Sequence, residues 1–338
     1  MRHFVIVGIL TAVMTYVIYV GLTSLGLMPV QASTQAISID WLWDWQVKAM
    51  SFLFALIVAP MLYSLVIFRR RKGESGDGQH FEGNYNLEIA WTVLPLFAVF
   101  AFAYMGASSL GEVRRLDPNA MVIKVHAVQW NWTFEYPEYG FSSDVLHLPL
   151  DRPIRLLMES TDVIHSFWVP EFRVKQDVVP GRVTELLITP DRLGAYRVRC
   201  AELCGTSHSY MEDDVLVEET VDFEKWALEQ QAIAIEASKT PEGRGRILAA
   251  IYCLGCHSIT STQLSGVAAP VWLGLFGKTE TLQDGSSVVV DEAYLIESIL
   301  NPLAKIVHGF TPSMPQTFAN TLSADQINDI IAFIKTLK

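Results

Sequence analysis

The only four cysteines in this 338-residue chain form two close pairs. Cys200 and Cys204 are four positions apart, whereas Cys253 and Cys256 are three positions apart. Such short spacings suit a bound metal ion or a haem better than a framework of disulfide bonds. We therefore expect two separate sites at which sulfur atoms hold a metal ion or a prosthetic group.

The first pair lies in the stretch CAELCGTSHSYM, in which His208 and Met211 follow the two cysteines. An apparent strand, AYRV, precedes it, so a tight loop would bring two thiolates, an imidazole and a thioether to one point. Soft sulfur ligands with imidazole favour copper. His165, which is expected to end another strand, could complete a set that suits two coppers bridged by both sulfurs. A disulfide would remove the thiolates, and structural zinc has little use for methionine.

The second pair belongs to the pattern Cys253-x-x-Cys256-His257, the attachment signal of a c-type haem. The two thiols bond the haem vinyl groups and the histidine supplies an axial nitrogen. The same five residues can also arise by chance or form a redox pair. A cytochrome needs a second axial ligand downstream, and Met314 is the only methionine of the C-terminal segment. His308 is the one rival, and Met314 is favoured because methionine raises the haem potential.

The last stretch, SADQINDIIAFIKTLK, predicts an amphipathic helix. A serine stands at the N-cap position, an acid follows in the first turn, and isoleucines recur at positions 327, 330, 331 and 334. With the attachment signal, and with Pro270 followed by LFGK, this helix resembles that of a class I cytochrome c. The resemblance covers about residues 241–338 and implies an all-α domain. The family's usual Gly-Pro is Ala-Pro here.

Composition points to a membrane and away from nucleic acid. The chain is 51% hydrophobic, at the top of the range for soluble proteins, and its formal net charge is −11 with a pI near 5.2. Phosphate binding needs concentrated lysine and arginine, so nucleic acid is excluded as a partner, and a cationic protein suits the charge better.

The first apolar run begins close to the N-terminus. Residues 4–22 carry no charge and are long enough to cross a bilayer, which takes about 20 residues. The basic start and the small-residue site MPVQAS are typical of a cleaved leader, whereas the apolar run is longer than usual for one. We expect residues 1–33 to be either a signal peptide or an additional transmembrane helix.

Two further runs, residues 49–68 and 89–110, predict a two-helix transmembrane hairpin at residues 40–111 rather than buried helices of a soluble domain. The basic cluster Arg69-Arg70-Arg71-Lys72 lies between them, which places the connecting loop in the cytoplasm and everything after residue 111 outside. Three tryptophans just before the second run, Trp41, Trp43 and Trp45, fit an aromatic belt at the outer surface.

Residues 112–220 predict a β domain. Short apolar runs such as MVIKVHAV, IRLLMES, RVTELLIT and DVLVEE alternate with turn material, which is typical of a sandwich or barrel. Residues 221–240 are polar and helix-prone, and we interpret them as a linker to the domain at 241–338. His126 and His147 lie in predicted strands and His80 in the predicted cytoplasmic loop, and we expect no metal role for any of them.

The motifs VIHSFWVP, VPGR and CAELCGTSHSYM resemble the copper A domain of cytochrome c oxidase subunit II, a cupredoxin-like barrel that follows a two-helix hairpin. The resemblance covers roughly residues 40–220. It implies that a dinuclear copper centre is held by His165, Cys200, Glu202 through its backbone carbonyl, Cys204, His208 and Met211. It also makes the Glu202 side chain a candidate ligand of a magnesium ion shared with subunit I.

Two further residues are assigned by this resemblance. QWNWTFEY resembles the aromatic segment in which the first tryptophan receives electrons above the copper, which makes Trp130 the candidate, although an indole is also a common core residue. The family's Gly-His before the glutamine is Ala-Val here. LEIAWTVLP resembles the start of the second hairpin helix, in which Glu88 would lie near a proton-path entrance or be an ordinary interfacial carboxylate.

The whole chain resembles subunit II of a caa3-type cytochrome c oxidase from a bacterial cell membrane. The resemblance implies a multi-domain fold: transmembrane helices, an all-β cupredoxin-like barrel and an all-α cytochrome c domain, with the copper and haem domains extracytoplasmic. A redox protein would reduce haem c, which would pass electrons through copper A to haem a of subunit I. Oxygen reduction to water and proton pumping would occur in subunit I, which assembles with other oxidase subunits.

Two alternatives stay open at this point. A nitric oxide reductase of the same superfamily can carry a copper A subunit. A membrane-anchored copper-binding or copper-delivery protein is an alternative of another class, although delivery gives no role to the haem-attachment signal. A quinol oxidase subunit is disfavoured because that relative lacks the copper ligands.

Overall fold

The computed structural model describes residues 1–70, 72–73, 78, 80, 82–115, 117–259, 269–312 and 314–338. The chain divides into two compact units. The first comprises Met1–Gln31 and Gln35–Arg115, and the second comprises Ala32–Thr34 and Leu116–Lys338.

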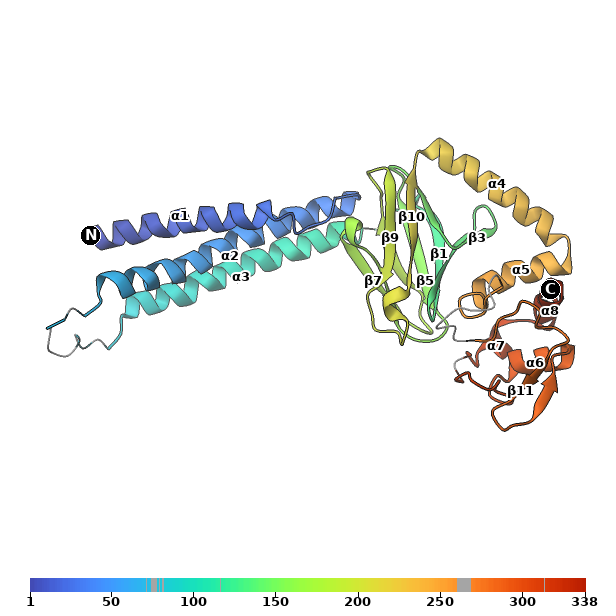
Figure 1. The fold of residues 1–338 in the computed structure, drawn as a ribbon. Helices are drawn as coiled ribbons and strands as arrows, with labels where there is room; N and C mark the ends of the chain where they lie inside the picture. The colour runs from blue at the N-terminus through green and yellow to red at the C-terminus, as the bar shows by residue number, and fades with distance from the viewer. Residues whose placement is uncertain are drawn as a thin grey trace. The chain divides into compact units, whose positions relative to one another are not determined.

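Three long helices form the first unit: α1 (Arg2–Ser24), α2 (Thr34–Ile67) and α3 (Tyr85–Val113). Each is long and apolar enough to cross a membrane. They lie side by side in Figure 1, and polar side chains join them. The Tyr19 hydroxyl donates to Asp44 Oδ1 at 2.7 Å, and Ser38 and Ser109 pair at 3.2 Å.

The hairpin helices extend beyond the apolar runs that predicted them. α2 begins at Thr34, well before the apolar run at residues 49–68. The three tryptophans of the expected aromatic belt therefore lie on this helix, where they are 40–52% exposed. The first apolar run is also helical. Arg71 of the basic cluster lies outside the described residues.

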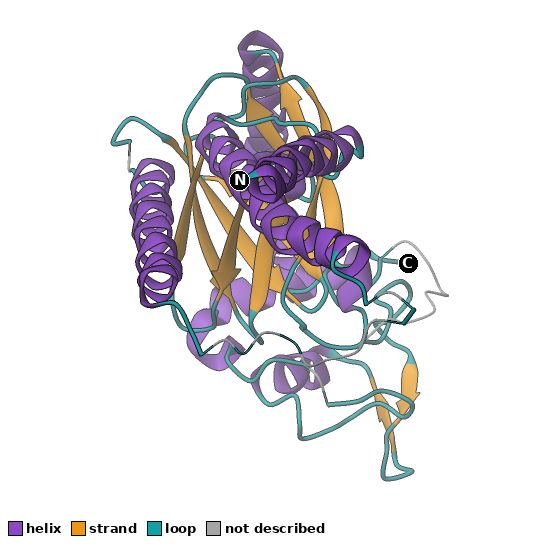
Figure 2. Ribbon diagram, turned by 90° about the vertical axis from the view of Figure 1, so that its left-hand side faces the viewer, coloured by secondary structure: helices purple, strands orange, loops and turns teal. Residues whose placement is uncertain are grey.

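Ten strands of the second unit form two five-stranded sheets, seen in orange in Figure 2. One sheet has the order β3-β2-β1-β5-β8 and the other β4-β10-β9-β6-β7. The strands are β1 (Met121–Val128), β2 (Asn131–Tyr136), β3 (Phe141–Ser143), β4 (Leu146–Pro149), β5 (Ile154–Ser160), β6 (His165–Val169), β7 (Val174–Val178), β8 (Thr184–Ile188), β9 (Gly194–Cys200) and β10 (Glu212–Glu218). The expected barrel is thus a two-sheet arrangement.

The buried side chains of these strands explain why they pair as they do. β5 alternates strictly between buried and partly exposed residues, as a strand with one face on a core must. Trp132, Phe134 and Phe167 are among the largest fully buried side chains and occupy the interior of the sandwich. The predicted strands MVIKVHAV and IRLLMES coincide with β1 and β5.

One strand boundary was predicted wrongly. His165 was expected to end a strand, but it begins β6. The preceding residues form a polar turn in which Asp162 accepts hydrogen bonds from Val163 N at 2.6 Å and Ser160 Oγ at 3.1 Å. The apolar residues after His165 then pair with β7 and β9.

The predicted linker is a helix that packs on the sandwich. α4 (Thr220–Ser238) buries Phe223 and Ala227 completely. Trp226 stacks on the His147 ring with centroids 3.7 Å apart, and its edge meets Tyr136 at 5.4 Å. Phe223 and Trp226 are one helical turn apart, so a single aromatic face on a polar helix is sufficient to dock it.

The C-terminal region contains α5 (Pro241–Tyr252), α6 (Glu292–Leu300), α7 (Phe318–Thr321) and α8 (Ala324–Thr336), together with a hairpin of β11 (Thr279–Thr281) and β12 (Ser287–Val289). The expectation of an all-α region was wrong at this hairpin. Its turn is an Asp-Gly pair: Asp284 Oδ1 accepts from the Ser286 amide at 2.9 Å, and Gly285 has a φ of +84°.

The closing helix was predicted correctly. Ser323 is the N-cap of α8 and forms a capping box with Gln326, which satisfies otherwise unpaired backbone amides. The four isoleucines at 327, 330, 331 and 334 are all buried. They pack in one hydrophobic cluster with Trp272, Tyr294 and Phe318, so α8 supplies one wall of the C-terminal core.

Candidate functional site

The sandwich brings together all six candidate copper ligands. They come from the ends of three adjacent strands and from the loop between β9 and β10. His165 begins β6, Cys200 ends the adjacent β9, and Met211 precedes β10, which pairs with β9. The loop between β9 and β10 holds Cys204 and, on a short 3-10 helix, His208. Adjacent strand ends therefore collect ligands that are far apart in the sequence.

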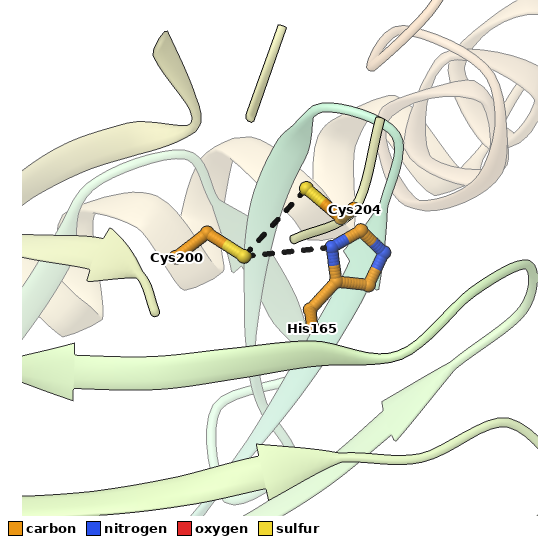
Figure 3. Close-up of side chains that lie close together, drawn as sticks. All are labelled: His165, Cys200 and Cys204. Atoms are coloured by element: carbon orange, nitrogen blue, oxygen red, sulfur yellow. Dashed lines mark hydrogen bonds between the residues drawn. The ribbon is translucent and has the colours of Figure 1, made fainter. Parts of the chain in front are cut away.

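Cys200 and Cys204 lie close to each other and to His165, as Figure 3 shows. Their sulfur atoms are 3.7 Å apart. Cys200 Sγ is 3.9 Å from His165 Nδ1 and 3.2 Å from the Glu202 carbonyl oxygen. Cys204 Sγ is 3.5 Å from His208 Nδ1 and 3.8 Å from Met211 Sδ. Each sulfur thus has one imidazole and one weaker donor beside it.

The surroundings favour the ionised form of one thiol. Burial opposes ionisation of Cys200, but hydrogen bonds with His165 and with the backbone of Glu202 and Ser166 outweigh it and lower its pKa. Burial and the negative charge of Cys200 raise the pKa of Cys204. Without a cation between them, only one of the two sulfurs therefore ionises readily.

The donor set fits a metal ion. The ligand atoms of His165, Cys200 and Cys204 lie within 4.8 Å of one another, and all three residues are buried. His165 Nε2 lies 2.9 Å from Asp162 Oδ1, so when Nε2–H donates to this carboxylate the Nδ1 lone pair can bind a metal ion in place of the hydrogen bond with Cys200. Two sulfurs, two imidazole nitrogens and a thioether form a soft donor set. The exposed Glu202 side chain points to no described partner within the second unit, whereas its carbonyl belongs to the cluster.

Trp130 lies beside this cluster, in the turn between β1 and β2. A Cβ on Gly205, which follows Cys204, would be 3.0 Å from Trp130 Cζ2, so the indole packs directly on the cysteine loop. Trp132, two residues on, is fully buried and meets the His165 ring edge to face at 6.1 Å. The two tryptophans of this segment therefore differ: one faces the loop and the other is core.

The second cysteine pair lines a separate, mostly apolar cavity. Cys253, Cys256, His257 and Met314 all contribute to its walls, and its empty volume of about 1070 Å³ includes the open mouth. The remaining lining includes Pro270, Trp272, Tyr294, Leu295, Ile299 and Ile334. His308 is not among the described residues of this lining.

His257 is held neutral and oriented. Its Nδ1–H donates to the Pro270 carbonyl at 2.7 Å, and its ring stacks on Trp272 with centroids 4.9 Å apart. Burial lowers the pKa of His257 to about 4. Burial also raises the pKa of Cys253 to about 12 and that of Cys256 to about 11. A neutral imidazole with a free Nε2, two thiols and a thioether around an apolar cavity fit a covalently attached haem.

The other histidines named from the sequence pair with carboxylates. His126 lies between Glu135 and Glu159, at 3.0 Å from each. His147 Nδ1 is 2.7 Å from Glu218, and exposed His80 is 3.3 Å from Glu82. Glu88 is exposed in the first turn of α3.

Sequence reasoning missed two residues that support the candidate metal site. Asp162 orients His165, and Gln129 Nε2 donates to the Cys204 carbonyl at 2.6 Å. Asp162 Oδ2 also accepts from the Gln129 amide at 2.6 Å. The aspartate three positions before a ligand histidine was the available signal for the first, whereas no sequence pattern indicates that Gln129 reaches the loop 75 residues away.

Comparison with known proteins gives consistent matches. The family described as cytochrome c oxidase subunit II, transmembrane domain, matches residues 21–108, and the periplasmic domain of the same subunit matches residues 142–220. Cytochrome c oxidase subunit 2 of a Synechocystis species is 34% identical over 248 residues, which is 60% of this chain and 75% of the relative. The Alkalihalophilus pseudofirmus protein of that name is 27% identical over 310 residues, 88% of each chain.

A solved structure, the periplasmic domain of cytochrome oxidase subunit II from Bradyrhizobium japonicum, is 27% identical, with 35% of this chain and 98% of that chain covered at a TM-score of 0.34. The transmembrane-domain match ends at residue 108 and the periplasmic-domain match ends at residue 220. The extent of the Synechocystis match, together with the family matches, shows that this chain belongs to the cytochrome c oxidase subunit II family.

Proposed function

We propose that this chain is the subunit II of a caa3-type oxidase and relays electrons from a covalent haem c, through a dinuclear copper A centre, to haem a of subunit I. Oxygen is reduced to water there, coupled to proton pumping. A redox protein outside the membrane is the donor. The domains after residue 111 are extracytoplasmic, on a chain anchored in a bacterial cell membrane by its N-terminal helices.

The observation that carries the proposal is the pair of donor sets around the two cysteine pairs. Copper supplies rapid one-electron chemistry when it is bound by the six donors around Cys200 and Cys204. The haem would be bonded through Cys253 and Cys256 and ligated by His257 and Met314, which line one cavity. All the residues of both proposed donor sets lie within the described part of the chain.

The chain's own residues orient these donors and exclude water. Asp162 holds the tautomer of His165, and the Pro270 carbonyl does the same for His257. Cys204 and Met211 are 3% and 1% exposed, which keeps solvent from the metal ligands. Rigid, dry ligand surroundings lower the reorganisation that each electron transfer requires.

Trp130, Glu88 and Glu202 have further proposed roles. Trp130 receives electrons above the copper because its ring packs on the cysteine loop. Glu88 contributes to the entrance of a proton path in subunit I, and its exposed position at the start of α3 suits an interfacial role. The exposed carboxylate of Glu202 suits a magnesium site shared with subunit I.

The relay is tested by kinetics of the purified oxidase with its physiological donor. Rapid reduction should appear first in the haem c absorption band and then in the near-infrared band of copper A. Deletion of residues 241–338 should abolish turnover with that donor while the near-infrared band persists. Unchanged turnover in the deletion variant would refute the relay.

A further inference from the structure

Two glycines, Gly205 and Gly255, lie against the turn between β1 and β2, residues 128–131. On one side, a Cβ on Gly205 would lie 2.8 Å from Gln129 Nε2. On the other side, a Cβ on Gly255 would lie 2.7 Å from Val128 Cγ2 and 2.9 Å from Asn131 Cβ. Real Cβ atoms do not come this close to other atoms. Both segments can therefore lie against the turn only because Gly205 and Gly255 have no side chain.

The two glycines belong to different cysteine pairs. Gly205 follows Cys204, whereas Gly255 lies between Cys253 and Cys256. The β1–β2 turn is therefore in contact with the copper-ligand loop and with the haem-attachment sequence at once. Both contacts lie within the second compact unit of the chain.

Hydrogen bonds reinforce both contacts. Gln129 Nε2 donates to the Cys204 carbonyl at 2.6 Å, and the Gln129 carbonyl accepts from Cys256 Sγ at 2.8 Å. Thr133 Oγ1 on β2 donates to the Ala250 carbonyl on α5 at 3.2 Å. A single residue, Gln129, thus touches one cysteine of each pair.

We propose that Gly255 is a positioning residue for electron transfer between the two centres, because its missing side chain lets the attachment sequence lie against the β1–β2 turn. The inference rests on the proposed function. The step is a one-electron transfer in which the haem is oxidised and the dinuclear copper is reduced. Its rate falls steeply with distance, so a displacement of the attachment sequence slows it.

The contact at Gly255 does not depend on the thiol of Cys256. When haem is attached, this sulfur is a thioether without a proton, so its hydrogen bond to the Gln129 carbonyl becomes a van der Waals contact. The packing of Gly255 on Val128 and Asn131 remains. The φ of Gly255 lies outside the left-handed region, so alanine is compatible with the backbone and only the neighbours resist it.

The test measures internal electron transfer in the complete oxidase after rapid reduction of the haem. Gly255→Ala should slow reduction of the copper centre by on the order of tenfold or more, as small displacements do in other positioned reactions. The haem band and the near-infrared copper band should keep their wild-type intensity. An unchanged rate with both bands present would overturn the inference.

A compensating variant separates positioning from a general structural defect. Val128→Ala removes the nearest atom and leaves Asn131 Cβ at 2.9 Å, so the double variant Gly255→Ala/Val128→Ala should recover part of the rate, whereas independent effects would add. Val128→Phe crowds the contact from the sandwich side with the attachment sequence intact, and it should also slow transfer. A double variant as slow as Gly255→Ala, or a wild-type rate in Val128→Phe, would contradict positioning.

This outcome is distinguishable from failure of the proposed function. If the wild-type chain carries no covalent haem or no near-infrared copper band, then the relay itself is wrong. If both bands are present and only the variant rates disagree, then the role of Gly255 alone is wrong.

Discussion

The two cysteine pairs have nearly equal spacing, but their surroundings differ most clearly at Cys200, because burial raises the pKa of Cys204 as well. Cys200 is held by hydrogen bonds with His165 and with backbone groups, which lower its pKa despite burial. Cys253 and Cys256 lie among apolar side chains, where burial raises their pKa values. A thiolate is a metal ligand, whereas a thiol kept protonated is available for bonding to a haem vinyl group. The difference teaches that surroundings, rather than spacing, determine what a cysteine pair can hold.

The largest expected effects come from mutating one cysteine pair at a time, because each pair should bind a different group. Cys200→Ser should abolish the near-infrared copper band and leave the covalent haem, because a serine hydroxyl does not replace a bridging thiolate. Cys256→Ala should do the opposite, with loss of a thioether bond and retention of the copper band. Optical spectra with metal analysis check both. Loss of both groups in either variant would mean that the sites are not separate.

Variants of Met314 sharpen the description of the apolar site. Met314→Leu keeps the size and apolar character of the side chain but removes the sulfur, so the haem should lose its axial thioether and its reduction potential should change. His308→Ala is the matched control and should leave the spectrum unchanged, because His308 is absent from the described lining of the cavity. A spectral change in the control alone would assign the ligand to His308.

Variants of α4 test whether this helix is docked on the β-sandwich or only connects it to the C-terminal region. Phe223→Ala removes a fully buried ring at the sandwich surface and should destabilise the protein by about 3–5 kcal/mol. Ile233→Ala on the same helix removes a side chain that is 61% exposed and should cost far less. Thermal unfolding in detergent measures both. Equal losses would show that α4 is a connector without a docked face.

Two histidines extend the comparison to pH. Apolar burial lowers the pKa of His257, whereas His126 is held between Glu135 and Glu159 with Lys124 and Tyr252 nearby. Burial alone would lower the pKa of His126, but hydrogen bonds to the two carboxylates raise it to about 9. Its folded form therefore binds a proton more tightly than its unfolded form, for which the pKa is near 6.5.

The stability that the protonated ring provides is complete below pH 6.5 and is lost as pH rises towards 9. Denaturant unfolding between pH 6 and 9.5 should show this decline in the wild type and a weaker decline in His126→Gln. Equal pH dependence of the two proteins in this range would contradict the assignment of a charged His126. Of the predicted effects, this one is the smallest.

Much of both sites could be predicted from local sequence. The order Cys200, Cys204, His208, Met211 lies within twelve residues, and the proposed haem-attachment sequence is contiguous. Helix α8 followed from its serine cap and its isoleucine spacing. Such features depend on neighbours along the chain, which a sequence displays directly.

The remainder depends on pairing between distant segments. Asp162 and Gln129 support the candidate metal site only because β1, β5 and β6 bring their ends together. The docking of α4 depends on two aromatic side chains whose partners lie some 80–90 residues earlier. The contact of Gly255 with the β1–β2 turn joins residues more than 120 positions apart. No local pattern indicates these partners. The β11–β12 hairpin is different, because its Asp-Gly turn is a local signal that could have predicted it.

The most direct test of the central claim is a count of metals per chain with an optical spectrum of the same purified sample. Two different groups at the two cysteine pairs require two coppers and one iron per chain, a near-infrared copper band and a covalent c-type haem band. One zinc in place of the coppers, or iron-free protein without a haem band, would contradict the account.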